Sequence, residues 1–217
     1  MAQTLAARSA TEASAGTFYD KIAGLYNLTF KFNGYGRSLH QYFRTHPIPL
    51  SRKARILDAG CGTGLLTVAL LKALDFPVRI TAIDLSGSSI VTAQKSVEKK
   101  AGREDKVWFA QANVLALPFA DNSFDFVVTS GVLEYVSLDE GLGELARVLK
   151  PRGYLLHLPV RPTPVGKLLG VMFRFKAYHP REVVKNTSRY FRVVKQHRFP
   201  PLQPISWSKT AVLAQKK

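Results

Sequence analysis

The sequence predicts an α/β fold: a Rossmann-like, doubly wound sheet of about seven strands, mostly parallel, with an antiparallel hairpin at its C-terminal edge. Two observations predict it. From residue 54 onward, short apolar runs alternate with segments of helical apolar spacing, which is typical of a parallel sheet covered by helices. A glycine-rich loop, ILDAGCGTG at residues 56–64, directly follows the first apolar run. Ligands of such sheets bind beyond the carboxyl ends of the strands, so this loop is placed for binding.

The expected elements follow one another along the chain. The expected strands cover residues 54–60, 78–84, 106–112 and 124–130, and residues 151–160 hold a turn followed by a fifth strand. Residues 188–199 and 205–215 form the expected edge hairpin. The expected helices cover residues 64–74, 88–102 and 138–150, and one or two more, broken by Pro and Gly, follow Val160. Ser86 is the expected N-cap of the second helix. Acids early and Arg147 and Lys150 late suit the dipole of the third helix.

The length of 217 residues fits one main domain. We divide the chain into an N-terminal arm and helical cap over residues 1–50 and a ligand-binding domain over residues 51–217, with a basic substrate-cap insertion at about 161–187. The N-terminus lacks the apolar core of a secretory signal, and a transit peptide is its weaker interpretation. No apolar stretch reaches the roughly 18 to 20 residues of a membrane span.

Cysteine and charge narrow the setting further. The single cysteine, Cys61, excludes an internal disulfide framework and a cysteine-based zinc site, and no metal-ligand spacing occurs, so we expect no metal and a cytoplasmic location. The net charge of +16 is uneven: residues 151–217 hold 14 basic residues and one acid, Glu182. This asymmetry indicates an anionic partner near the C-terminal third, against the alternative of a merely solvated surface.

The loop indicates the kind of ligand. A nicotinamide-binding loop has the spacing G-x-G-x-x-G, whereas Gly60, Gly62 and Gly64 are spaced G-x-G-x-G. Asp58, two residues before the first glycine, would repel a pyrophosphate but attract an ammonium or sulfonium group. Asp84 ends the second strand, where an acid can accept both ribose hydroxyls. These residues favour an adenosine-type ligand with a cationic part and no pyrophosphate, a description that S-adenosylmethionine fits.

On these residues, the chain resembles the class I S-adenosylmethionine-dependent methyltransferases, near the ubiquinone/menaquinone C-methyltransferase-like group. ILDAGCGTG and AIDLS match the first two motifs of that family. QANVLALPFADNSFDFVV matches the adenine-contact loop and fourth strand, and SGVLEYV with ELARVLKPRGYLL matches the stretch that leads to the fifth. The resemblance covers roughly residues 54–158 and is specific as a set. It implies an enzyme whose cofactor is S-adenosyl-L-methionine.

The resemblance also implies roles for the motif residues. The three glycines let the backbone approach the methionine part of the cofactor. Asp58 helps to fix its ammonium, directly or through water. Asp84 holds the ribose hydroxyls, and Leu85 packs on the adenine.

Further contacts are implied beyond the second strand. Asn113, where many relatives have aspartate, offers a carbonyl to the adenine amino group, and Val114 offers a backbone N–H. Ser130 lies where the fourth strand ends under the methionine; a plain capping role is its alternative. Tyr19 and Tyr26 could close over the methionine end.

The acceptor is less determined. Methyl transfer from a sulfonium depends on positioning and desolvation, so the catalytic residues stay unknown; His157 is a weak candidate for a base. The nucleobase-type signature [DNS]-P-P-[YF] is absent after the fourth strand. FYDKIAGLYN resembles the opening of quinone C-methyltransferases and related lipid methyltransferases, but SGVLEYV replaces their glycine-arginine-asparagine signature, and Pro159 replaces a glutamate.

We therefore expect methylation of a small-molecule or lipid-like acceptor, with a quinone or a phospholipid among the candidates. Residues 161–185 mix apolar side chains with cations, so an anionic membrane surface is an expected partner and peripheral membrane association an expected location. The alternative for this segment is an ordinary cap helix. An RNA or ribosome-associated methyltransferase is the first rival function, and nucleic acid the less favoured partner; a non-catalytic binding protein of the same fold is the second rival.

Overall fold

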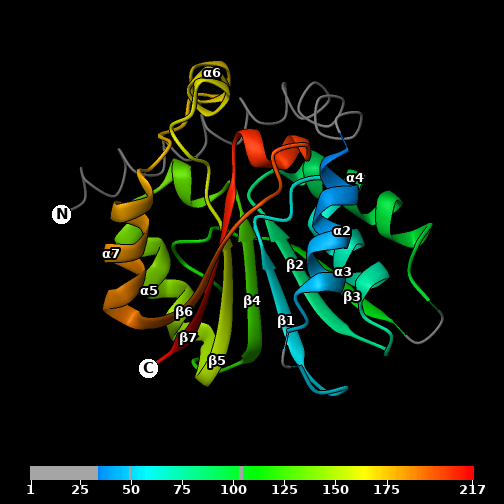
Figure 1. Ribbon diagram of the computed structural model, residues 1–217. Helices are drawn as coiled ribbons and strands as arrows, with labels where there is room; N and C mark the ends of the chain where they lie inside the picture. Colours follow the sequence, from blue (N-terminus) through cyan, green and yellow to red (C-terminus); the bar gives the residue numbers. More distant parts are fainter. Residues whose placement is uncertain (1–33, 49, 103–104) are drawn as a thin grey trace.

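A single mixed sheet forms the centre of the molecule (Figure 1). The computed structural model describes residues 34–217 apart from 49 and 103–104, and in this part seven strands pair into one sheet. The strands are β1 Arg55–Ala59, β2 Arg79–Asp84, β3 Lys106–Gln111, β4 Phe124–Ser130, β5 Leu149–Leu158, β6 Phe191–Arg198 and β7 Thr210–Lys216. Their order is β3-β2-β1-β4-β5-β7-β6. The first five are parallel, and β7 pairs antiparallel with β5 and β6, which confirms the predicted fold class and edge hairpin.

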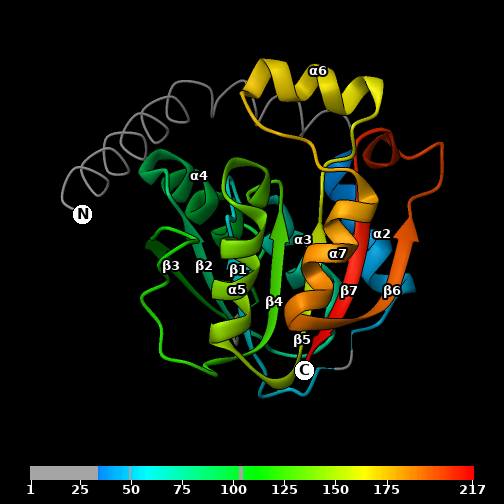
Figure 2. The ribbon, with the colours of Figure 1, turned by 90° about the vertical axis from the view of Figure 1, so that its left-hand side faces the viewer.

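Helices cover both faces of this sheet (Figures 1 and 2). The described helices are α2 Tyr35–Thr45, α3 Leu65–Ala73, α4 Gly87–Glu98, α5 Leu138–Val148, α6 Pro164–Phe173 and α7 Pro180–Tyr190, with 3-10 turns η1 Leu133–Tyr135 and η2 Pro204–Trp207. One face carries α2, α3 and α4, and the other carries α5 and α7. In both views α6 stands beyond the carboxyl ends of the parallel strands, clear of either face.

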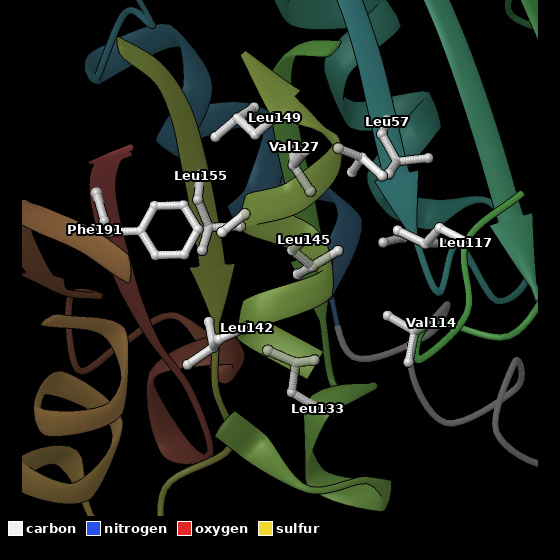
Figure 3. Packing of buried hydrophobic residues seen from close by; sticks show 14 of the residues in the cluster. Leu57, Val114, Leu117, Val127, Leu133, Leu142, Leu145, Leu149, Leu155 and Phe191 are labelled. Carbon is white, nitrogen blue, oxygen red and sulfur yellow. The ribbon is translucent and has the colours of Figure 1, made fainter. Parts of the chain in front are cut away.

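Strand alternation assigns side chains to the two cores. In β1, Ile56 packs with α2 and α3, whereas Leu57 packs with the side of α5. Figure 3 shows the core on the face covered by α5 and α7, in which Leu142 and Leu145 of α5 pack with Val127 of β4. Because both faces are covered, the central strands are mostly apolar, and the polar residues Asp58 and Ser130 lie near their carboxyl ends.

Local signals place most element boundaries. The Ser86 side chain accepts a hydrogen bond from the Ser89 amide at 3.1 Å, so the predicted N-cap of α4 is confirmed. β5 begins at Leu149, where the sequence predicts a helix through residue 150 and then a turn, because the chain enters sheet pairing at once and continues through an irregularity at Arg152, which has φ +63°. The division into an N-terminal cap and a binding domain stays a prediction. No helix of the described residues combines the length and apolar content that crossing a membrane requires.

Candidate functional site

The site lies at the carboxyl ends of the adjacent strands β1 and β4, where the chain segments that follow them separate. β1 pairs with β2 on one side and with β4 on the other, so the helices after β1 and β4 leave toward opposite faces. The glycine-rich loop bridges β1 and α3 at this switch point. Such a point leaves a crevice at the carboxyl edge of the sheet, which is where the topology places ligands.

Two glycines are required by the shape of this loop. Gly60 has φ +76°, and a Cβ there would lie 2.6 Å from the Cβ of Val132, just after β4. Gly64 has φ +86°, and its added Cβ would lie 3.1 Å from the Ala93 Cα of α4. Larger residues would therefore push the loop away from both neighbours. Gly62 also has a positive φ, of +52°, but open space around it, which suits a close ligand.

Asp84 organises the loop from the end of β2. Its Oδ2 accepts a hydrogen bond from the Gly62 amide at 2.8 Å, and its Oδ1 accepts one from the Ser86 amide at 2.9 Å. The carboxylate is half-buried at the end of the strand. The neighbouring Leu85 is also half-buried, and its carbonyl accepts from the Gln111 side chain at 2.8 Å. Asp84 thus joins the loop, β2 and α4.

Asp58 is a buried carboxyl beside the loop, with a fractional exposure of 0%. Its Oδ2 accepts a hydrogen bond from the Thr67 hydroxyl of α3 at 2.5 Å, whereas Oδ1 has no partner among the described residues. Burial, and to a smaller extent the charge of Asp84, raises the pKa of Asp58 to about 7 against an opposing effect of Thr67. A buried carboxyl with one unpartnered oxygen is suited to a cationic ligand group.

A second wall of the site follows β3. Asn113 is half-buried and its Oδ1 accepts a hydrogen bond from the Leu115 amide at 2.9 Å, so this carbonyl shapes its own turn. Val114 is buried in the α5 core. Arg147 of α5 holds the loop by donating to the carbonyls of Leu117 and Phe119 at 3.0 and 2.8 Å.

Ser130, at the end of β4, belongs to a polar group that crosses the sheet edge. Its hydroxyl lies 2.7 Å from the Tyr35 hydroxyl of α2 and accepts from the Lys209 ammonium at 3.1 Å. His157, deep in β5, is buried and neither ring nitrogen has a partner among the described residues. Burial, and then the charge of Lys209, lowers the pKa of His157 to about 3, so the imidazole is neutral.

The structure brings most predicted site residues to one edge of the sheet. Asp58 lies on β1, Asp84 ends β2 and Ser130 ends β4. The three glycines come from the loop after β1, Leu85 directly follows β2, and Asn113 and Val114 come from the loop after β3. Tyr19 and Tyr26 lie outside the described residues. No group of three His, Cys, Asp or Glu side chains in the described part of the chain could hold a metal ion.

The sequence analysis did not predict four residues of this edge: Thr67, Tyr35, Glu134 and Lys209. Glu134 carried a signal, because it is an acid inside the apolar run SGVLEYV, and the structure buries it. The other three are contributed by helices or by the strand hairpin, and their sequence surroundings give no sign of their partners.

Known proteins share this architecture. The chain matches the family model described as a methyltransferase domain over residues 57–157. It is 31% identical over 194 residues to the demethylmenaquinone methyltransferase of Lactiplantibacillus plantarum, covering 82% of this chain and 81% of the relative. It is 29% identical over 208 residues to the ubiquinone/menaquinone biosynthesis C-methyltransferase of Pasteurella multocida, covering 92% and 76%. A crystal structure of geranyl diphosphate C-methyltransferase from Streptomyces coelicolor, with S-adenosyl-L-homocysteine bound, has a TM-score of 0.70 at 16% identity over 83% and 76% of the two chains.

The raised pKa of Asp58 predicts a specific pH dependence of stability for the ligand-free protein. An acid whose pKa rises from 3.8 to about 7 on folding binds more protons in the native state between these values. Its contribution to the free energy of unfolding is therefore full below about pH 4 and is lost as the pH rises to about 7, with a slope of up to about 1.4 kcal/mol per pH unit. Urea unfolding at several pH values should show this slope, reduced in Asp58→Asn.

The matched control is Asp75→Asn, which changes an exposed aspartate just after α3. It should leave the pH dependence as in the wild type. Equal slopes for wild type and Asp58→Asn would show that Asp58 is ionised without cost in the folded protein.

Proposed function

We propose, because the chain belongs to the class I S-adenosylmethionine-dependent methyltransferases, that it methylates a small-molecule acceptor of lipid-like character, with a quinol as the first candidate. The observation that supports S-adenosylmethionine as the cofactor is the arrangement of Asp58, Asp84 and the glycine loop at the switch point of the sheet. Two relatives named as quinone-pathway methyltransferases support the acceptor class.

The residues present fit this cofactor on two observations. The unpartnered Oδ1 of Asp58 offers a carboxylate oxygen for an ammonium, and the absence of a side chain at Gly62 lets a ligand approach the backbone. We assign the ribose hydroxyls to the Asp84 carboxylate and the adenine to Leu85, Asn113 and the Val114 amide. The cofactor supplies a methyl group activated on a sulfonium.

The residues of the chain would then position the methyl donor against the acceptor and exclude water from both. The β1 loop and the segment after β4 approach closely, so the methyl donor and the acceptor would meet beside Ser130. Tyr19 and Tyr26 remain proposed closing residues on the strength of the sequence alone. His157 remains a weak candidate, since a neutral imidazole with a pKa of about 3 is a poor base.

An apolar rim supports a lipid-like acceptor. We use this name for six exposed side chains at the carboxyl end of the sheet: Val165, Leu168, Val171, Met172, Leu202 and Trp207. The first four lie on α6, and Val171 is 81% exposed. Thr163, the N-cap of α6, donates to the Trp207 carbonyl at 2.5 Å, which joins the two parts of the rim. An exposed apolar surface of this kind marks a contact with a membrane or a partner.

Cations accompany the rim, which favours an anionic membrane surface as its occupant. Lys167 projects from α6, and Arg174 and Lys176 follow its C-terminal end, all three exposed. Apolar insertion combined with basic charge is the pattern of helices that lie in the interface of anionic bilayers. We therefore propose that the rim rests on the membrane and that the acceptor enters from it.

Cofactor binding tests the assignment of Asp84. Isothermal titration should show that Asp84→Ala weakens S-adenosylmethionine binding more than tenfold, because two ribose hydroxyls and the Gly62 amide lose their acceptor. Asp75→Ala serves as the matched control and should bind as the wild type does. Unchanged affinity in a folded Asp84→Ala protein would remove the ribose assignment.

Methyl transfer tests the acceptor class. Purified protein with methyl-labelled S-adenosylmethionine should label reduced demethylmenaquinone or a lipid extract, and should leave total RNA unlabelled. Labelled RNA would favour the RNA-methyltransferase alternative. Cofactor binding without label in any fraction would favour a binding protein of the same fold.

Vesicle flotation tests the rim. The protein should bind vesicles containing phosphatidylglycerol more tightly than neutral vesicles, and Lys167→Gln with Arg174→Gln and Lys176→Gln should weaken this binding about hundredfold, at about 1 kcal/mol per cation. Val171→Ser should weaken it further, whereas Val194→Ser, at an equally apolar exposed position on β6, should not. Equal binding by all variants would reject the rim as the contact.

A further inference from the structure

A chain of polar side chains runs inward from the carboxyl end of β4. The Tyr35 and Ser130 hydroxyl oxygens are 2.7 Å apart, and the Lys209 Nζ lies 3.1 Å from the Ser130 Oγ. Lys209 begins the approach to β7 and is 2% exposed, and its ammonium also donates to the Leu158 carbonyl at 3.2 Å. A lysine is rarely buried to this degree, because removing an ammonium from water is costly unless its charge is used or balanced.

Glu134 balances the positive charge of Lys209 only in part. Its carboxylate is 3% exposed, and Oε1 accepts a hydrogen bond from the Val160 amide at 2.5 Å. Its Oε2 has no partner among the described residues, and no ion pair joins it to Lys209, although the two charges attract through space. A buried pair that served stability alone would be expected to close into direct contact. The arrangement instead leaves the lysine bonded to the serine.

Ser130 connects this interior to the ligand edge. It follows Thr129, which pairs with Ala59 at the end of β1, so Ser130 stands opposite Gly60. The close approach of Gly60 and Val132 fixes the distance between these segments. Ser130 is half-buried, whereas Lys209 is enclosed behind it. A group bound at the edge would therefore meet the Ser130 hydroxyl first and Lys209 only through it.

We propose that Ser130 and Lys209 form a proton relay that removes the proton of an acidic hydroxyl, an enol or a phenol, from the methyl acceptor. This inference rests on the proposed function and narrows its acceptor to molecules that must lose a proton. Ser130 is the residue in contact with the acceptor, and Lys209 is a positioning residue that acts through it.

The proposed step balances in atoms and charge. The acceptor O–H bond breaks, and its proton passes to the Ser130 oxygen while the Ser130 proton passes to the neutral Lys209 amine. The electrons released make the acceptor nucleophilic at its oxygen or at the conjugated carbon, a new bond forms from that atom to the methyl carbon, and the sulfur–methyl bond breaks with its electron pair remaining on sulfur. Where the new bond is to carbon, the hydrogen on that carbon then leaves as a proton and returns to the acceptor oxygen, which restores the hydroxyl. The positive charge thus leaves the sulfonium and appears on Lys209, which later releases the proton to water.

Electrostatics around Lys209 suit this exchange. Burial lowers the pKa of Lys209 to about 8, against the opposing effect of the Glu134 charge. The other groups that face it are His157 of β5, which is neutral, and the hydroxyls of Ser130 and Tyr35. A sulfonium bound at the loop would lower the pKa further and keep the amine neutral. Loss of that charge on methyl transfer raises the pKa again, when the proton must be held.

Proton release on binding tests the relay without any acceptor. Titration calorimetry near pH 8, in buffers of different ionisation enthalpy, counts the protons released when S-adenosylmethionine binds, with S-adenosylhomocysteine as the neutral-sulfur control. The wild type should release more protons than Lys209→Met with the first ligand and as many with the second. Equal release by both proteins with S-adenosylmethionine would overturn the relay. Absence of binding to the wild type would instead overturn the proposed function.

Kinetics with a hydroxylated acceptor such as reduced demethylmenaquinone provide the second test. Lys209→Arg keeps the charge but cannot give up its proton, so kcat should fall about 10² to 10⁴-fold while KM for S-adenosylmethionine stays near the wild-type value. Ser130→Thr should keep most of the activity and Ser130→Ala should lose it. Full activity in Lys209→Arg, or equal activities of the two Ser130 variants, would contradict the relay.

Discussion

The candidate site depends on one close approach, between the loop after β1 and the segment after β4. At Gly60 no side chain fits, since Val132 occupies the space that a Cβ would need. The amides of Gly60 and Cys61 both donate to the Ile83 carbonyl, at 2.9 and 2.8 Å, and so bind the same loop to β2. The three strand ends are thereby held as one rigid edge, and the groups on them keep fixed separations without a ligand. Preorganisation of this kind is what a positioning enzyme requires.

A buried acid and a buried base lie along this edge. Asp58 is enclosed on the α3 side of β1, where burial raises its pKa, and Lys209 is enclosed beyond β4, where burial lowers its pKa. Each group is therefore biased toward its neutral form in the empty protein. A cationic ligand would stabilise the charged form of Asp58 and the neutral form of Lys209. The positive charge of the ligand thus favours ionised Asp58 and deprotonated Lys209. Cofactor binding beside Asp58 is therefore linked to the proton affinity of Lys209.

The sequence predicted the parts of the site that lie on consecutive strand ends. The alternation of strands and helices places Asp58, Asp84 and Ser130 at the same edge, because parallel strands carry their carboxyl ends together. Thr67, Tyr35 and Lys209 could not be found in this way. Thr67 reaches Asp58 because α3 packs back on β1, and Lys209 reaches Ser130 across 79 residues only once β7 has inserted between β5 and β6. Such contacts depend on packing and strand order, which no local pattern encodes.

Structure also adds to sequence in the choice between RNA and an anionic membrane, the two partners that the basic C-terminal third permits. A charge excess alone fits RNA and an anionic membrane equally, because both present phosphates. The exposed apolar side chains of α6 add an observation that charge does not contain. RNA binding gains from stacking aromatics and amide donors, whereas Leu168 and Val171 offer aliphatic surface alone, 61% and 81% exposed. Since α6 stands beyond the carboxyl ends of the parallel strands, this aliphatic surface lies at the same end of the sheet as Ser130, the last residue of β4. We therefore propose the lipid-like acceptor and the membrane contact together, because the same exposed surface of α6 supports both.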